Sequence, residues 1–353
     1  MRVGAIGIGQ AGGRILDLLT YHSRWGIGRD ILPFSLAINT AEADLRTLKV
    51  IPKRDRILIG VSQARGHGVG LIREEGATLT EEALPSIMRS IVEKSIEYID
   101  AFWIVVGLGG GTGSGGAPVI ASKLKQLYDQ PVYVLGALPT RDEGNLMTEN
   151  AVACLKELHP IVDGTLIFDN DQWRKEGAAL EQCYGYMNYE FISPFPILLA
   201  AGEVPEKMIG IKVVDGSDII ATLKDLSFIG YWKLPTRTFA ERFLFFFRRR
   251  GIERMRPALA CSTAVRNAAT KMSGDCDSGR ATKALMVIAA PPKYTSMEGY
   301  SDARFWLQNY YPNAEIRGGD FPMRGTSEIN AVLLVGGVRE IPRLGLKLED
   351  KKK

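Results

Sequence analysis

Short apolar runs alternate with half-polar segments along residues 2–170. The runs are rich in Val, Ile and Leu, which is typical of strands buried on both faces of a parallel sheet. We expect strands at residues 2–8, 33–38, 57–60, 101–106, 131–138 and 164–169. The segments between them predict helices at residues 14–22, 80–99, 117–128 and 146–158, with Thr80 as an N-cap and Pro118 in a first turn. Strands that alternate with helices indicate a doubly wound α/β domain.

The pattern changes after residue 176. Residues 176–203 are helical in composition but contain Pro194 and Pro196, which we expect to kink the helix. The segments that follow predict an acidic turn at residues 215–218, helices at 219–226, 238–272 and 297–311, and strands at 284–290, 314–317 and 329–335. This mixture is typical of a smaller α+β domain. The charged residues at the end of the sequence are expected to be disordered.

A glycine-rich stretch at residues 107–116 directly follows the apolar run at 101–106. Glycines at this density let several backbone N–H groups face one point, and a helix N-terminus behind them adds partial positive charge. Thr112 and Ser114 add hydroxyl groups. This combination suits a diphosphate or triphosphate. The alternative, a flexible linker, is disfavoured because a buried strand and a helix flank the stretch.

A second glycine-rich turn, at residues 7–13, follows the first expected strand. Its GxGxxG spacing fits a Rossmann dinucleotide site. Such a site also needs an acidic residue at the end of the second strand, where this chain has Asn39 and Thr40. Residues 61–76 are rich in glycine and contain Arg65 and His67, and they fit either a loop beside a ligand or a solvated connection.

Composition narrows the class of protein. The chain has 353 residues, 46% hydrophobic and 24% charged, with a formal net charge of +4, as expected of a globular protein that does not bind nucleic acid. The four cysteines show no CxxC spacing, so we expect reduced thiols, and the three histidines do not suggest a metal cluster. We find no signal peptide or long apolar span and therefore expect a cytoplasmic protein.

Taken in their order along the chain, the motifs resemble those of the tubulin/FtsZ superfamily over nearly its whole length. Residues 109–115 match the signature GGGTG[ST]G without a mismatch, and residues 9–12 and 39–41 resemble the first and second phosphate loops. The resemblance implies that nucleotide contacts come from Gly9, Gln10, Ala11, Gly12, Asn39, Gly109, Gly110, Gly111, Thr112, Gly113, Ser114, Glu143, Asn170, Asp171, Tyr184 and Asn188.

The last members of this set are implied to contact ribose and base. Glu143 and residues 170–171 resemble the ribose and guanine contacts. Tyr184 resembles the tyrosine that stacks on guanine, and Asn188 the asparagine that hydrogen-bonds its edge. Four residues apart on a helix, Tyr184 and Asn188 share a face, which suits a purine. A core tyrosine is the alternative.

Three departures place the chain within the superfamily. Position 147 is Met where the EGxxR motif of FtsZ has Arg, and position 213 is Val where the NxDxx[DE] loop begins with Asn. The tail lacks the acidic-apolar peptide of FtsZ. With residues 139–144 and 215–220 and the basic end, the chain looks most like the archaeal tubulin-like CetZ group. The resemblance therefore does not extend to the phosphate or transition-state contact that an arginine at position 147 would make.

The resemblance implies the tubulin/FtsZ fold: a Rossmann-like GTPase domain (1–178) with a parallel sheet, a long central helix with an acidic loop (179–220), a smaller α+β C-terminal domain (221–345) and a charged tail (346–353). It implies a GTPase that binds GTP and GDP. The chain has no GxxxxGK[ST] lysine. We therefore expect Mg²⁺, held mainly by phosphates and water, to supply much of the charge neutralisation.

Asp215 and Asp218 resemble the acids that hydrolyse the nucleotide of the neighbouring subunit. A 25-residue central helix would span about 37 Å, so these acids could not reach the nucleotide of their own chain. A head-to-tail contact would bring them to the next subunit and generate a protofilament. The alternative role is capping of the helix that follows. The resemblance favours catalysis.

Three functions remain open from the sequence. The first is a polymerising GTPase that serves cell shape or division. The second is a weakly polymerising, regulatory GTP-binding paralogue, and the third is a nicotinamide-dependent oxidoreductase, disfavoured because the second-strand acid is missing. The aromatic and arginine residues at 243–250 suggest either a membrane or adaptor contact, or packing inside the second domain.

Overall fold

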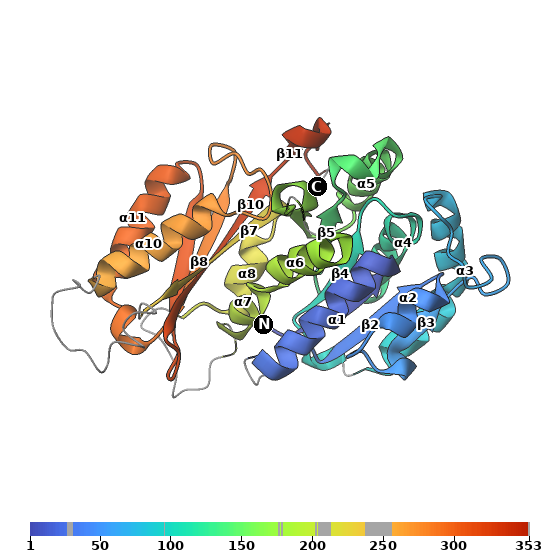
Figure 1. Cartoon of the computed structure of the whole chain (residues 1–353), viewed down its shortest axis with the longest axis horizontal. Helices are drawn as coiled ribbons and strands as arrows, with labels where there is room; N and C mark the ends of the chain where they lie inside the picture. Colours follow the sequence, from blue (N-terminus) through green and yellow to red (C-terminus); the bar gives the residue numbers. More distant parts are fainter. Residues whose placement is uncertain are drawn as a thin grey trace.

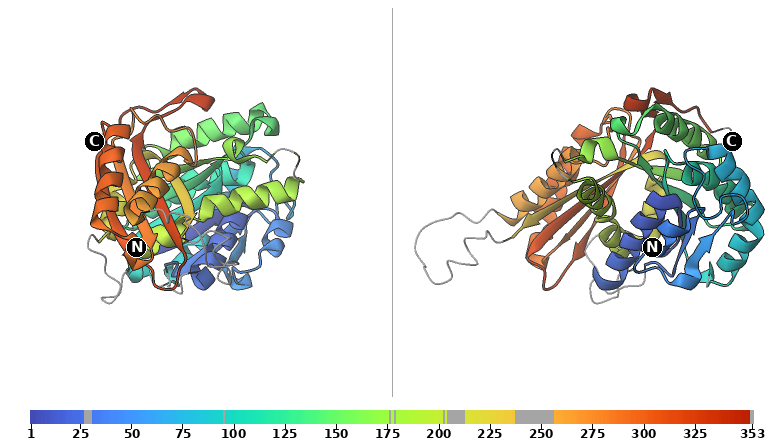
Figure 2. Two further views of the ribbon diagram at one scale, coloured as in Figure 1. Left: turned by 60° about the vertical axis from the view of Figure 1, so that its left-hand side comes forward. Right: turned by 45° about the vertical axis from the view of Figure 1, so that its right-hand side comes forward.

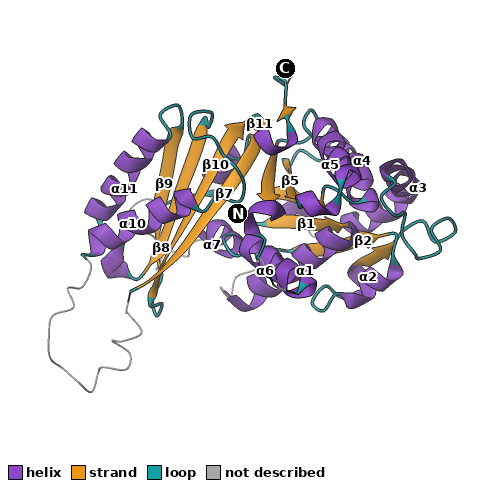
Figure 3. Ribbon diagram, turned by 45° about the horizontal axis from the view of Figure 1, so that its top comes forward, coloured by secondary structure: helices purple, strands orange, loops and turns teal. Residues whose placement is uncertain are grey.

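The computed structural model describes residues 1–26, 31–94, 96–175, 177, 179–201, 203, 213–236 and 256–351. These residues form one ten-stranded sheet in the order β3-β2-β1-β4-β5-β6-β7-β10-β8-β9. The sheet runs through the whole molecule, with α2 and α3 near one end and α10 and α11 at the other (Figure 1). Two further sides are shown in Figure 2, and Figure 3 separates strands from helices by colour.

The first six strands are parallel and confirm the sequence prediction to within two residues at each end. They are β1 (Val3–Ile8), β2 (Phe34–Asn39), β3 (Arg56–Leu58), β4 (Ala101–Gly107), β5 (Val132–Leu138) and β6 (Gly164–Asp169). All side chains of β1 are buried because helices cover both faces of the sheet. Alternate residues of a strand therefore belong to different cores: Ile6 and Ile8 lie in one apolar cluster, and Ala5 lies in the other.

The helices divide between these two faces. The cluster that contains Ile6 includes side chains of α3 (Arg73–Val92), α4 (Gly111–Leu127), α5 (Asn145–Leu158), α10 (Pro257–Thr270) and α11 (Met297–Tyr310). The other cluster includes α1 (Gly9–Gly26), α2 (Glu42–Thr47), α6 (Leu180–Ile192), α7 (Phe195–Ala201) and α8 (Gly216–Thr222). Short 3₁₀ turns include Lys53–Asp55, Ile96–Tyr98, Arg141–Glu143, Asn170–Trp173, Pro292–Tyr294 and Pro342–Leu344.

The beginnings of α1, α3 and α4 differ from the prediction. Helix α1 begins at Gly9 rather than at residue 14, so most of the second glycine-rich turn is its first turn. Helix α3 begins at Arg73, so Thr80 is not its N-cap: the residue is buried within the helix and its hydroxyl donates to the Gly76 carbonyl at 2.7 Å. Helix α4 begins at Gly111, which leaves Pro118 inside the helix. Pro118 has no N–H for the Ser114 carbonyl, and that oxygen accepts from Arg73 Nη2 at 3.4 Å instead.

Most of the glycine stretch is therefore helix rather than loop. A Cβ added at Gly115 would lie 2.0 Å from the Arg73 carbonyl oxygen of α3, closer than any side chain permits. Glycine at this position lets α3 and α4 pack backbone against backbone. The tight packing adds a structural reason for the glycines to the phosphate-binding reason that the sequence suggested.

The central helix is broken, as the prolines predicted. Helix α6 ends at Ile192 and α7 begins at Phe195, with Pro194 between them. The 13 residues of α6 span about 20 Å. The continuous 25-residue helix that was expected to separate the acidic loop from the nucleotide is therefore not present in the described residues.

The C-terminal half shares the sheet rather than forming a separate one. Its strands are β7 (Asp225–Pro235), β8 (Lys283–Ala290), β9 (Glu315–Pro322) and β10 (Glu328–Val338). Strand β7, which the sequence analysis missed, pairs in parallel with β6 and antiparallel with β10. Helix α8 ends at Thr222, short of the predicted 226, because the chain turns into this strand.

The end of the chain is also ordered further than predicted. A small hairpin joins β11 (Glu340–Ile341) to β12 (Leu346–Lys347). Leu348 is buried, and Lys351 donates to the Val162 carbonyl at 2.5 Å. The expected disorder of the tail is thus wrong as far as residue 351.

Two sequence predictions fall on segments outside the described residues. Only the part of the expected helix 238–272 that corresponds to α10 is described, and the aromatic and arginine cluster at 243–250 lies outside. Among the helices described, none is both long and apolar enough to pass through a membrane.

Candidate functional site

The carboxyl ends of the parallel strands meet at one cleft. Gly9 follows β1, Asn39 ends β2, Gly107 ends β4, and Pro139 and Asn170 follow β5 and β6. All five line one cavity of about 410 Å³, a volume typical of small-molecule sites. The position agrees with the rule that ligands of such sheets bind beyond the strand ends.

Nearly all the predicted nucleotide contacts line this cavity. They are Gly9, Gln10, Ala11, Asn39, Gly109, Gly110, Gly111, Thr112, Gly113, Glu143, Asn170, Tyr184 and Asn188. They come from the segments at the carboxyl ends of five strands and from α6, so the fold brings together residues that are far apart in the sequence.

Gly12, Ser114 and Asp171 are not among the lining residues. A Cβ on Gly12 would lie 2.2 Å from the Val105 carbonyl oxygen, so this glycine allows α1 to pack on β4. Ser114 is fully buried and its hydroxyl donates to the Gly110 carbonyl. Asp171 accepts from the backbone N–H of Arg141 at 3.0 Å and forms an ion pair with its side chain. All three support the walls of the cleft.

Hydrogen bonds join the first two loops to the glycine segment. Asp44 accepts from Gln10 Nε2 at 2.8 Å and from Asn39 Nδ2 at 3.1 Å. The Asn39 side-chain oxygen in turn accepts from the N–H of Thr40 at 2.8 Å. The hydroxyls of Thr40 and Thr112 are 2.7 Å apart, so they tie the second loop to the start of α4. The backbone N–H groups of these loops are thereby held in place beside the cleft.

The other end of the cleft carries an aromatic ring beside an amide. Tyr184 and Asn188 both line it from α6, as their spacing predicted. The Tyr184 hydroxyl donates to Glu143 Oε1 at 2.5 Å, while Glu143 Oε2 accepts from the Thr140 N–H at 2.7 Å. Burial and the neighbouring Glu143 raise the pKa of Tyr184 well above its usual range, so its hydroxyl stays protonated.

Several lining residues were absent from the sequence-based set. Asp44 lies in the first turn of α2 and Arg14 in the second turn of α1. Arg14 is the only lysine or arginine among the described residues that line the cleft. His67 and residues 68–71 line it too. Of the two interpretations of residues 61–76, the geometry therefore favours a loop beside the ligand site. The signal was their glycine content, which does not by itself locate a loop.

A buried ion pair supports the floor of the cleft. Asp169, the last residue of β6, is joined to Arg343 by an Oδ2–Nε contact of 2.7 Å, and the two side chains are only 3% and 9% exposed. Arg343 Nη2 also donates to the carbonyl of Pro139, which lines the cleft, at 3.0 Å. Burial raises the pKa of Asp169, and its attraction to Arg343 is the largest effect that opposes the rise. Sequence reasoning missed this pair.

Asp215 and Asp218 lie at the opposite edge of the sheet. A Cβ on Gly216 would lie 3.7 Å from the Cβ of Met1, which precedes β1, whereas Gly9 follows that strand. The six residues of β1 separate the two edges by about 20 Å. The acids therefore do not reach the cleft of their own chain, although the helix used to infer this from the sequence is broken.

The two acids also cap α8. Asp215 Oδ1 accepts from the Asp218 N–H at 3.0 Å, and Asp218 Oδ2 accepts from the Asp215 N–H at 3.3 Å. Hydrogen bonds, chiefly from Ser217, hold the pKa of Asp215 below its usual range, so it is ionised at neutral pH. The capping role considered as an alternative is present, and it leaves the acids partly exposed.

Within the part of the chain that the structure describes, no three or more His, Cys, Asp or Glu side chains form a group that could hold a metal ion. The lining carboxylates are also engaged, because Asp44 and Glu143 accept from neighbouring groups. A divalent cation would fit here as the companion of bound phosphates rather than in a cage of protein ligands.

A mixed, mostly parallel sheet with a glycine-lined cleft at one edge and an acidic loop at the other defines the tubulin/FtsZ class of fold. The Tubulin/FtsZ family GTPase domain matches residues 2–177, and the C-terminal domain of tubulin-like CetZ matches residues 177–351. The chain belongs to the tubulin/FtsZ family and, within it, to the CetZ proteins.

Individual relatives agree with this assignment. CetZ1 and CetZ3 of Haloferax volcanii are 38% and 39% identical to the chain, and each match covers 98% of this chain and 90% of the relative. Solved structures include the GDP-bound monomer of CetZ1 (TM-score 0.85, 37% identity, 98% and 96% of the two chains). The GTPγS-bound protofilament of CetZ2 from the same organism also matches (TM-score 0.83, 34% identity, 98% and 95%).

Proposed function

We propose that this protein binds GTP in the cleft and hydrolyses it when subunits stack head to tail. The observation that carries the proposal is the placement of the cleft and the acids at opposite edges of one sheet. Stacking two copies in the same direction brings the acids of one to the cleft of the other. Such a contact does not close on itself, so it yields a filament. The GDP-bound monomer and the GTPγS-bound protofilament of related CetZ proteins support nucleotide binding and assembly into a protofilament.

In this proposal the two ends of the cleft bind different parts of the nucleotide. Backbone N–H groups of residues 9–11 and 109–113 and the Arg14 guanidinium bind the phosphates. Tyr184 stacks on the guanine and Asn188 hydrogen-bonds its edge, while Glu143 contacts the ribose. Mg²⁺, held mainly by phosphates and water, supplies charge neutralisation when bound.

The acids of the adjacent subunit complete the hydrolytic site. Asp218, with Asp215 beside it, orients a water whose oxygen attacks the γ-phosphorus. The bond from that phosphorus to the β–γ bridging oxygen breaks, which leaves GDP and inorganic phosphate. The proton of the water passes to the carboxylate or to solvent.

Mixed filaments test whether the acids act in trans. Asp218→Ala removes the acid but keeps the cleft, and Tyr184→Ala weakens the cleft but keeps the acid. Each variant alone should hydrolyse GTP slowly, whereas a mixture should regain phosphate release at junctions that join an intact cleft to an intact acid. GTP binding by Asp218→Ala should be unchanged. Wild-type turnover by assembled Asp218→Ala would refute the role of the acid.

A weakly polymerising regulatory paralogue is the second candidate. Met147 lines the cleft beside Gly109. The cleft therefore has an uncharged thioether at the position where the EGxxR motif of FtsZ has an arginine. Phosphate release measured against protein concentration separates the two: a steep rise supports the polymerising GTPase, and a linear dependence supports the regulatory protein. ATP serves as the nucleotide control.

We further propose that the filaments act in the cytoplasm in cell shape or division. Self-association is the only partnership that the proposal requires. Whether residues 243–250 contact a membrane or an adaptor is tested by co-sedimentation with anionic vesicles, comparing wild type with a variant whose residues Arg248, Arg249 and Arg250 are replaced by Gln.

A further inference from the structure

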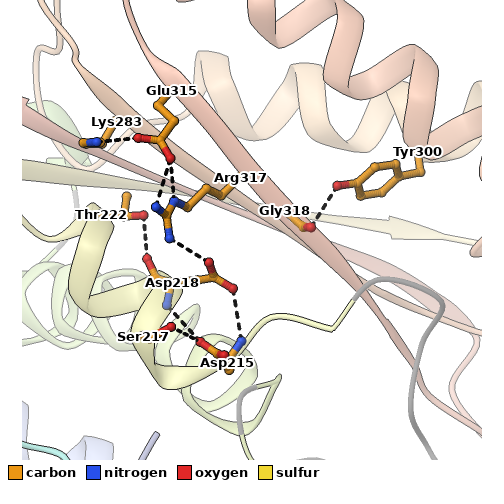
Figure 4. A network of polar contacts seen from close by, with 9 residues as sticks. All are labelled: Asp215, Ser217, Asp218, Thr222, Lys283, Tyr300, Glu315, Arg317 and Gly318. Carbon is orange, nitrogen blue, oxygen red and sulfur yellow. Dashed lines mark hydrogen bonds and ion pairs between the residues drawn. The ribbon is translucent and has the colours of Figure 1, made fainter.

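The Asp218 carboxylate is held from both sides by groups of its own chain (Figure 4). Its Oδ1 accepts from Arg317 Nη1 at 2.9 Å, and its Oδ2 accepts from the Asp215 N–H at 3.3 Å. The second contact is long for an N–H···O hydrogen bond, whereas the first is charge-assisted and of ideal length. Arg317 therefore provides the firmer of the two contacts that orient this carboxylate.

Arg317 is itself fixed by the strand that carries it. It lies on β9, in register with Leu285 of β8. Its Nε and Nη2 both contact Glu315 Oε1 at 2.9 Å, and Glu315 Oε2 contacts Lys283 Nζ at 2.5 Å. Hydrogen bonds from Lys283 and Arg317 hold the pKa of Glu315 below its usual range, so the chain of alternating charges persists at neutral pH. The contacts with Glu315 thus orient the Arg317 guanidinium independently of Asp218.

The backbone of α8 does not depend on Arg317. Ile219 and Thr222 are fully buried, and the Thr222 hydroxyl donates to the Asp218 carbonyl at 2.7 Å. The ion pair, in contrast, is partly exposed: the side chain of Arg317 is 33% exposed and that of Asp218 is 26% exposed. Ion pairs of this kind add little to stability. Loss of Arg317 should therefore free the carboxylate without unfolding the helix.

We propose that Arg317 is a positioning residue for hydrolysis: it orients the Asp218 carboxylate toward the nucleotide of the adjacent subunit. This inference rests on the proposed function, in which Asp218 acts in trans. It also makes the C-terminal half of the sheet, through β9, part of the hydrolytic machinery. A water must be placed within a fraction of an ångström of its line of attack, so a carboxylate that rotates freely costs turnover without costing binding.

The test compares Arg317→Gln and Arg317→Lys with wild type. We expect Arg317→Gln to lower kcat for GTP in assembled protein by about tenfold to a hundredfold, because misplacement of a catalytic group has effects of this size. The GTP affinity of the monomer and the critical concentration for assembly should stay within about twofold of wild type. Arg317→Lys keeps the charge but loses the planar fork and should recover part of the rate.

Arg339→Gln is the matched control, because Arg339 is also a partly exposed arginine of the C-terminal half, paired with Asp225 and Asp350. It should leave kcat unchanged. A double variant, Arg317→Gln with Asp218→Ala, should hydrolyse GTP no more slowly than Asp218→Ala alone, because Arg317 acts only through the Asp218 carboxylate.

The outcomes distinguish the positioning role of Arg317 from the proposed catalytic role of Asp218. If Asp218→Ala turns over GTP as wild type does, the proposed function fails and the role of Arg317 falls with it. If Asp218→Ala is inactive but Arg317→Gln keeps the wild-type kcat, only the positioning role is overturned. A raised critical concentration with unchanged kcat would also overturn it, because Arg317 would then be a contact between subunits.

Discussion

Replacing Arg343 by Met should destabilise the protein strongly. The change leaves Asp169 as a buried carboxylate without its ion-pair partner, and the two side chains are 3% and 9% exposed. Breaking a buried pair from one side costs about 3–5 kcal/mol. Asp169 keeps the N–H of Asp171, at 3.1 Å from Oδ1, so we expect the lower end of that range, about 3 kcal/mol at neutral pH.

The loss should depend on pH with a definite sign. Burial already raises the pKa of Asp169, and removing Arg343 removes the largest opposing effect, so the pKa rises further in the variant. A carboxyl with a raised pKa in the folded state costs nothing below the unfolded value of about 4, where both states are protonated. Above it the unfolded state ionises first, so stability falls as the pH rises. The difference between variant and wild type should therefore be larger at neutral than at acidic pH.

Urea unfolding at two pH values, about 4.5 and 7.5, measures this difference. Lys125→Met is the control, because its ion pair with Asp163 is partly exposed and should contribute less than about 1 kcal/mol. Adding Asp169→Asn to Arg343→Met should restore part of the stability, since an amide has no charge to desolvate. A loss of less than about 1 kcal/mol, or an equal loss at both pH values, would refute the reasoning.

Three further predictions concern packing, recognition and thiol chemistry. Gly115→Ala should lower the melting temperature and cost about 1–3 kcal/mol or more of stability, because its Cβ meets a carbonyl oxygen of α3 at 2.0 Å. The control Gly185→Ala, which has open space around it on α6, should raise the melting temperature slightly. An unchanged melting temperature for Gly115→Ala would contradict the tight packing. Tyr184→Phe should weaken GTP binding about fivefold by removing the 2.5 Å hydrogen bond to Glu143, and Tyr184→Ala should weaken it more because the ring is lost as well. If Tyr184→Ala binds a fluorescent nucleotide as tightly as the wild type does, this ring does not stack on the base. Burial raises the pKa of Cys154 to about 12, so at pH 8 only about one thiol in ten thousand is ionised. A thiol reagent should therefore label Cys154 only as the protein unfolds. Rapid labelling of the native protein would be inconsistent with this burial.

The sequence by itself predicted the elements whose burial is uniform and the loops whose chemistry is local. Five of the first six strands, β1, β2, β4, β5 and β6, read as short apolar runs because both faces are covered, so their pattern needs no knowledge of their partners. The glycine-rich stretch at residues 107–116 was found in the same way, because phosphate binding needs glycines and a helix N-terminus that are adjacent in the chain. Asn39, Glu143 and Asn170 were expected from the family resemblance alone. Tyr184 and Asn188 were expected from the family resemblance, and their helical spacing is consistent with a shared face.

Only the tertiary structure decided the features that depend on distant partners. Strand β7 was missed because about half of its residues are intermediate or exposed and its pairing with β6 and β10 is long-range. The reason for glycine at position 115 is the approach of α3, which no local pattern shows. Arg343 and Arg317 contact aspartates 174 and 99 residues away. Charge pairs at such separations leave no periodic signal in the chain, because it is the fold, and not the spacing, that brings them together.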